Sequence, residues 1–252
     1  MRKITYDAVL HRKRQLDIDQ TDVEITGGTI TGVTVALDTY YAEMAIIDNA
    51  SATVINGNEQ WQALTTYVVT GMVDGFTYDA GSTGVIASIA DATGGDILVT
   101  DEAHGLSAGN IITINGCTDS AYNGIFEVLT VPSVDTFTVN AVYTATDTGF
   151  WQRGSSLICG VGSAGTYRGQ WASSGISSVN AHIFDFAPCV NTTISTKAKA
   201  RRKFSNDDYG SFSGCALMTV AEGDVITFIV QNVGATGNVT MRTLDLNLVK
   251  IK

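Results

Sequence analysis

The densest group of side chains that could bind a ligand is a run of five cations between residues 197 and 203. On an extended strand, Lys197, Lys199, Arg201 and Lys203 would share one face and Arg202 would point to the other. Such a strip suits an acidic partner: a polyanionic glycan, a lipid phosphate or the anionic middle of this same chain. The same residues could instead keep an edge strand soluble or form ion pairs with a neighbouring subunit. The sequence leaves both interpretations open.

The histidines and cysteines do not have the spacing of a catalytic or metal site. Neither group forms a CxxC motif or a Cys/His ligand pattern; the residues are His11, His104, His182, Cys117, Cys159, Cys189 and Cys215. A catalytic triad would also need a nucleophile motif. Acidic loops such as residues 206–208 could hold calcium, but such loops are more often solvated turns. We therefore expect structural histidines, no enzymatic activity, no cofactor and no metal.

Residues 225–230 form the most apolar run of the chain, with apolar side chains on both faces of the expected strand. A strand with water on one side should alternate. We therefore predict that this strand is buried twice, once in its own sandwich and once against an identical chain. The predicted contact residues, which include two from the closing strand, are Val225, Thr227, Phe228, Ile229, Val230, Leu244 and Leu246.

Composition and charge narrow the class of protein. The chain has 252 residues, 44% of them hydrophobic, with 26 glycines and only 2 prolines. Short strands joined by turns fit this mixture, and long helices do not. The net charge of −10 disfavours nucleic-acid binding. We expect no membrane span because no apolar run approaches 18 residues, and we expect no signal peptide, so the thiols should stay reduced.

The distribution of charge and turns divides the chain into three parts. Residues 1–38 are expected to form an extended arm, whose predicted docking residues are Arg2, Lys3, Arg12, Lys13, Arg14, Ile25 and Ile30. Residues 39–84 and 153–252 read as one domain split by an insertion, because residues 39–84 alone could not bury enough surface. Residues 85–152 read as an inserted small β module without any Lys or Arg. A solvated, frayed N-terminus is the alternative to the arm.

Two stretches resemble known families. The turn Glu222-Gly223-Asp224, the apolar strand after it and the ending Leu244-Asp245-Leu246-Asn247-Leu248 resemble the closing strands of tumour-necrosis-factor and complement-type jelly-roll heads. Those heads are usually trimers and are carried by many phage fibre tips and capsid decorations. The order Ala-His-Gly-Leu, Gly-Asn-Ile-Ile-Thr-Ile, Tyr-Asn-Gly-Ile-Phe-Glu-Val and Asp-Thr-Phe-Thr-Val within residues 103–139 is similar to a small β module of phage tail and capsid proteins.

Together these observations predict an all-β protein: a trimeric jelly-roll sandwich interrupted by a small barrel-like module and preceded by an arm. The resemblance implies a phage virion structural protein, either a capsid decoration or a head fibre, assembled in the host cytoplasm. The expected partners are two sister chains and the major capsid protein or another virion protein. The alternative is a tail-fibre or spike protein that binds a host surface glycan.

Overall fold

The computed structural model describes residues 40–252 except positions 54, 56–58, 65–67, 178, 206–207 and 236. The chain divides between Leu37 and Asp38 into two units, and the fold described here is that of the second. The predicted arm and its docking residues, Arg2, Lys3, Arg12, Lys13, Arg14, Ile25 and Ile30, lie outside the described residues.

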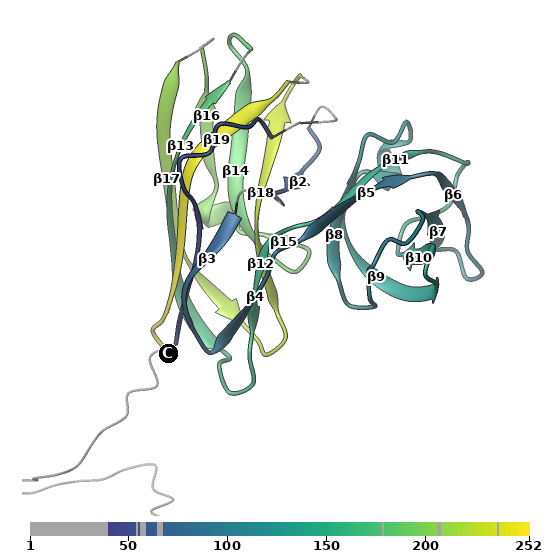
Figure 1. The fold of residues 1–252 in the computed structure, drawn as a ribbon, viewed down its shortest axis with the longest axis horizontal. Coiled ribbons are helices and arrows are strands. Elements are labelled where there is room, and N and C mark those ends of the chain that lie inside the picture. Colours follow the sequence, from purple (N-terminus) through teal and green to yellow (C-terminus); the bar gives the residue numbers. More distant parts are fainter. Residues whose placement is uncertain are drawn as a thin grey trace, which may run out of the picture. The chain divides into compact units, whose positions relative to one another are not determined.

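The described chain is almost entirely antiparallel β structure, which confirms the predicted fold class. One sheet of the sandwich, sheet A, has the strand order β17–β13–β19–β1–β3 (Figure 1). The bounds are β1 Tyr41–Ile46, β3 Val68–Asp74, β13 Gly165–Ser177, β17 Tyr209–Val220 and β19 Val239–Lys250.

The second sheet, sheet B, has the order β15–β14–β18–β12–β4, with β16 also paired to β14 and β2 to β18. The bounds are β2 Gln62–Ala63, β4 Phe76–Asp79, β12 Ser156–Cys159, β14 Ile183–Val190, β15 Thr193–Ile194, β16 Ala200–Lys203 and β18 Val225–Val233. In sheet B, the closing strand β18 lies between β14 and β12. In sheet A, the last strand β19 lies between β13 and β1. This Greek-key ordering is that of a jelly roll.

Aromatic side chains from both sheets fill the space between them. Trp171 of β13 contacts Phe228 of β18 edge to face, with 4.9 Å between ring centroids. Phe186 of β14 stacks on Phe212 of β17 at 4.1 Å. These side chains point inward because successive residues of a strand alternate between its two faces. The core is therefore built from strands in which buried and more exposed residues alternate, as they do along β13.

The strand β18 is buried on both faces, but its own chain supplies both coverings. Ile226, Phe228 and Val230 lie in the core between the sheets. On the other face, Ile229 contacts a second apolar cluster that includes Ala63. The remaining members of that cluster are Ala187, Cys189, Trp61, Ile125 and Ile194.

The single chain already covers most of the residues that were predicted to contact a sister chain. Val225 is half-buried, and the other six are buried in the single chain: Thr227, Phe228, Ile229, Val230, Leu244 and Leu246. While the sandwich is closed, these residues offer a sister chain almost no surface. The two apolar faces of this strand are visible in the sequence, and in the single chain the second face packs against Ala63 and Ile125. The homotrimer itself stays a prediction.

The inserted module is a sheet that closes on itself. Its strand order is β5–β11–β8–β9–β10–β7–β6, and the outermost strands β5 and β6 are separated only by Ala87. The bounds are β5 Ser82–Ile86, β6 Ser88–Asp91, β7 Ile97–Thr100, β8 Ile111–Asn115, β9 Gly124–Ser133, β10 Thr136–Val139 and β11 Gly149–Arg153. A separate core that includes Trp151, Tyr122 and Phe137 fills it. The observed module thus runs from Ser82 to Arg153, compared with the predicted 85–152.

Hydrogen bonds join the module to the segment around β2. The Ala63 amide donates to Thr113 Oγ1 at 3.2 Å. The Gly116 amide donates to Gln60 Oε1 at 2.9 Å. Ile125 of β9 adds an apolar contact to the cluster beneath β18. The module therefore helps to cover sheet B, a role that its sequence does not reveal.

Candidate functional site at the cationic edge

The five-cation run lies at the edge of sheet B, where the strand pairing aligns it with one carboxylate. Asp185 of β14 is the Cα partner of Arg201 in β16 and of Gln231 in β18. Its neighbours Phe184 and Phe186 point into the core, so Asp185 points to the outer face of the sheet. The short 3₁₀ turn Thr196–Ala198 then brings Lys199 to the same place.

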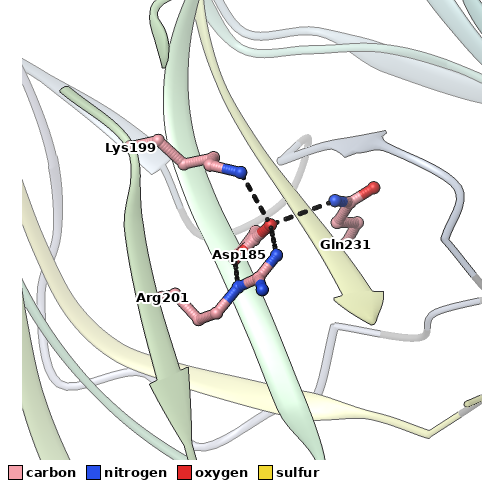
Figure 2. A network of polar contacts seen from close by, with 4 residues as sticks. All are labelled: Asp185, Lys199, Arg201 and Gln231. Carbon is pink, nitrogen blue, oxygen red and sulfur yellow. Dashed lines mark hydrogen bonds and ion pairs between the residues drawn. The ribbon is translucent and has the colours of Figure 1, made fainter. Parts of the chain in front are cut away.

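Three side chains surround this carboxylate in a network of polar contacts (Figure 2). Arg201 Nε donates to Asp185 Oδ1 at 2.7 Å and Arg201 Nη2 donates to Oδ2 at 2.8 Å. Lys199 Nζ lies 3.1 Å from Oδ2, and Gln231 Nε2 lies 3.2 Å from the same oxygen. Both hydrogen bonds of this two-point contact join charged groups, which makes each of them stronger than a hydrogen bond between neutral groups.

The network is buried at its centre and open at its rim. The Asp185 side chain has no exposed surface, while those of Arg201 and Lys199 are 55% and 33% exposed. Burial alone would raise the pKa of Asp185, but the hydrogen bonds from Arg201, Lys199 and Gln231 outweigh it and hold the pKa below its usual value. The same contact raises the pKa of Arg201. The site therefore stays ionised at neutral pH and carries a net positive charge.

The other cations of the run are placed differently. Lys197, in the 3₁₀ turn, and Lys203, at the end of β16, are exposed. Arg202 points away from them: its Nη1 donates to the Ser211 carbonyl at 3.2 Å, and its guanidinium lies 5.5 Å from the centroid of the Phe204 ring. Arg202 thus lies on the opposite face to Arg201 and Lys203, as the strand alternation requires.

Asp185 and Gln231 were missed by the sequence reasoning. Asp185 is the only charged residue in the apolar stretch 183–187, and this is the signal that marks it. A lone carboxylate on a buried strand needs a cation to compensate for its lost hydration. Nothing in the sequence identifies which cation, because Arg201 meets it through strand pairing.

The described histidines are used in structural contacts. His104 Nδ1 accepts a hydrogen bond from the Leu106 amide at 2.9 Å, and its ring contacts Phe137 edge to face. The Nδ1 atom of His182 lies 3.0 Å from Nδ2 of Asn232. These contacts hold each imidazole in place within a turn or against a strand; His104 is buried and His182 is half-buried.

Burial makes the internal thiols weak nucleophiles. It raises the pKa of Cys189 to about 12. Burial also raises the pKa of Cys117 to about 12, with contributions from Asp147 and Asp119, and raises the pKa of Cys159. The reactive form of a cysteine is the thiolate, which these environments disfavour. Cys215, by contrast, is exposed on β17.

The large aromatic rings that could stack on a sugar are mostly internal. Trp151 and Trp171 are each 1% exposed. Their indole nitrogens donate to Asp101 Oδ2 at 2.7 Å and to the Ala198 carbonyl at 2.9 Å. Trp61 is half-buried against the cluster beneath β18. The tryptophans therefore serve packing first.

Among the residues that the structure describes, no group of three or more His, Cys, Asp or Glu side chains is placed to hold a metal ion. Two residues of the suggested calcium loop, 206 and 207, lie outside that set. No helix in the described ranges is long and apolar enough to cross a membrane.

Comparisons with known proteins add only distant likenesses in structure. No protein-family model and no curated protein matches the chain. The insecticidal delta-endotoxin Cry8Ea1 of Bacillus thuringiensis is similar over 84% of this chain and 53% of its own, at 10% identity and a TM-score of 0.25. An uncharacterized protein of Listeria monocytogenes is similar over 80% and 29%, at 8% identity and a TM-score of 0.21. This chain thus spans about half of the endotoxin's length, and such low TM-scores bear on no function.

Proposed function

We propose that this chain is a non-enzymatic phage virion protein, a homotrimeric capsid decoration or head fibre that docks through its N-terminal arm. The observation that carries the proposal is the division of the chain. In the head, the sandwich and the inserted barrel are each filled by their own core. The head follows a separate unit, residues 1–37, which has five cations among its first fourteen residues. Such a division suits a protein that attaches at one end and displays the other.

The groups that most often do chemistry support binding rather than catalysis. The described imidazoles are held in structural contacts, and the buried thiols have raised pKa values. A binding protein gains free energy of association from the apolar area that it buries against its partner, less the cost of association. The virion, as capsid or tail surface, is the location that the sequence resemblance favours.

Binding to a host surface glycan is the second candidate, and the cationic edge favours it. Lys197, Lys203 and the outer side of Arg201 are exposed around an Asp185 anchor that fixes the arginine. A guanidinium held in this way keeps N–H donors for a carboxylate or sulfate of an acidic glycan. A neutral glycan is less favoured because two of the three tryptophans are buried.

Deletion of residues 1–24 tests the docking role of the arm. Particles assembled without this protein are mixed with full-length or truncated protein, and bound protein is measured after the particles are pelleted. We expect the truncated protein to be lost from the pellet, because the deletion removes the basic cluster and leaves only residues 25–33 of the predicted docking segment. A full-length variant with Lys197 and Lys203 changed to Gln serves as the control and should still bind. If the truncated protein coats particles as well as the full-length chain does, the docking role is refuted.

A further inference from the structure

The polar network at the cationic edge belongs to a row of side chains that crosses the outer face of sheet B. Asp185 of β14 has Arg201 of β16 and Gln231 of β18 as its Cα partners, one on each side. Beyond β18 lies β2, which brings Trp61 to the end of the row. The row therefore runs from a cation, across a buried carboxylate and an amide, to an aromatic ring.

Strand pairing and burial place Trp61 in that row. The strand β2 pairs Gln62 with Val230, so Trp61, the residue before Gln62, comes level with Gln231. Gln62 and Val230 are buried. Because successive residues of a strand point to opposite faces, Trp61 points outward. It is half-buried against the apolar cluster that includes Ile229, so packing holds the ring while part of it stays open to a ligand.

We propose that this row is a binding site for an acidic sugar, whose ring stacks on Trp61 and whose carboxylate or sulfate is held by Arg201. The inference rests on the second candidate function, binding to a host surface glycan, and assigns a site to it. The ring contact is added to the attraction between charges. A single sugar unit, rather than the charge of a long polymer, is therefore what the site recognises.

Arg201 keeps the donors that such an anion needs. Asp185 accepts from Nε and Nη2 of the guanidinium at 2.7 and 2.8 Å. Among the described residues, the third nitrogen, Nη1, makes no hydrogen bond or ion pair (Figure 2). The remaining N–H groups on Nη1 and Nη2 lie side by side at the tip of the planar group and match two oxygens of one anion. Because Asp185 already fixes the guanidinium, little side-chain freedom is lost on binding.

The charges on this face favour an anion. The hydrogen bond and the charge of Asp185 raise the pKa of Arg201, and the charge of exposed Glu59 adds to the rise. These two carboxylates are outnumbered by the cations Lys199, Arg201 and Lys203. An incoming anion therefore meets an excess of positive charge, which steers it towards the row.

The spacing of the row suits a ligand that carries both a ring and an anion. Neighbouring strands lie about 4.8 Å apart, so the Cα atoms of Trp61 and Asp185, two strands apart, are separated by about 10 Å. Gln231 lies between them, with its amide nitrogen 3.2 Å from Asp185 Oδ2 and its oxygen turned away (Figure 2). That oxygen can accept a hydrogen bond from a sugar hydroxyl, while C–H groups of the sugar face the negative π surface of the indole ring.

Isothermal titration calorimetry of the full-length protein with defined tetramers tests the site. The probes are a galacturonic acid tetramer, its neutral methyl ester, a sulfated galactose tetramer and the peptide tetraglutamate. We expect the protein to bind the uronate or the sulfated tetramer. The neutral ester and the acidic peptide should each bind at least about tenfold more weakly. The uronate and sulfate probes show which acid group the site takes.

Matched variants separate the row from the rest of the surface. Arg201→Lys keeps a cation beside Asp185 but removes the fork of donors, and Trp61→Leu keeps an apolar cover but removes the ring. Each should weaken binding at least about tenfold. Arg202→Lys makes the same exchange on the opposite face of β16, and Tyr209→Leu removes an exposed ring on β17. Both controls should bind as the wild type does.

Tryptophan fluorescence gives an independent readout of the ring contact. The sugar should change the emission of the wild type and leave that of Trp61→Leu unchanged, because Trp151 and Trp171 are buried. Urea unfolding midpoints of the variants show that each one is folded when it is titrated. An emission change of the same size in Trp61→Leu would mean that the ring contact is wrong.

The outcomes separate the site from the function on which it rests. If the wild type binds an acidic tetrasaccharide and the Arg201 and Trp61 variants bind it equally well, the row is not the site although glycan binding stands. If tetraglutamate binds as tightly as the acidic sugars, charge alone is recognised and the inference is wrong. If the wild type binds neither acidic tetrasaccharide, both the site and glycan binding are wrong, and docking of the arm is still judged by particle binding.

Discussion

Replacing Asp185 with asparagine should lower the free energy of unfolding at pH 7 by about 1–3 kcal/mol. The substitution keeps the size of the side chain but removes the charge that Arg201 and Lys199 neutralise at 2.7 and 3.1 Å. One side-chain oxygen becomes an amide nitrogen, which would face cationic donors in a position with no exposed surface. The lost hydrogen bonds and the uncompensated cations act in the same direction.

Urea unfolding followed by tryptophan fluorescence measures this effect, because Trp171 lies in the core of the sandwich. Urea is preferable to guanidinium chloride, which is a salt and would screen the ion pairs. The matched control is Asp48→Asn. Asp48 pairs with Arg242 at 3.3 Å, but its side chain is 88% exposed, so the control should change stability little.

The pH dependence gives a further check on the cause. The pKa of Asp185 is lower in the folded protein than in the unfolded chain, so its ionised form stabilises the fold above the unfolded value of about 3.9. That contribution is lost as the pH falls through the lower, folded pKa. The difference between wild type and Asp185→Asn should therefore shrink in acid. Equal urea midpoints for the two proteins at pH 7, or an equal loss in Asp48→Asn, would refute the reasoning.

Two further predictions concern the inserted module and the thiols. Tyr122→Phe should destabilise the module by about 1–3 kcal/mol, because the Tyr122 hydroxyl accepts from the Thr144 and Ala145 amides at 2.8 and 3.0 Å and donates to the Ala145 carbonyl at 2.9 Å. Faster amide hydrogen exchange at residues 144–145 would report the loss, and unchanged exchange would contradict it. In the native protein at pH 8, a thiol reagent should modify exposed Cys215 and leave Cys117 and Cys189 intact until urea is added. Rapid modification of Cys189 without denaturant would show that its surroundings open.

The fold class was predictable because its signals are local. Alternating strands, glycine turns and the two-faced apolar run at residues 225–230 are properties of short stretches, and they gave an all-β sandwich with an insertion. What covers the second face of that run was not predictable. Ala63 and Ile125 reach Ile229 from parts of the chain more than a hundred residues away, and no local pattern specifies that contact.

The candidate site was predictable only in part, for the same reason. The cations of residues 197–203 stand out in the sequence, and the alternation that separates Arg202 from Arg201 follows from strand geometry. Their anion does not stand out, because Asp185 appears as one polar residue in an apolar strand. The register between β14 and β16 decides that Arg201 is its neighbour, and register follows from packing of the whole sheet.

The antiparallel pairing of β5 with β11 has a consequence for how the protein could change. Ser82 and Arg153, which enter and leave the inserted module, are Cα partners, so the two junctions lie only about 5 Å apart. A different compact domain with adjacent termini could be grafted there without lengthening any connection of the head. Such a domain would have to supply an apolar side chain in place of Ile125, which packs beneath β18, and an acceptor for the Ala63 amide in place of Thr113 Oγ1. The junction thus allows the inserted domain to be exchanged, while the need to cover β18 limits which domains can replace it.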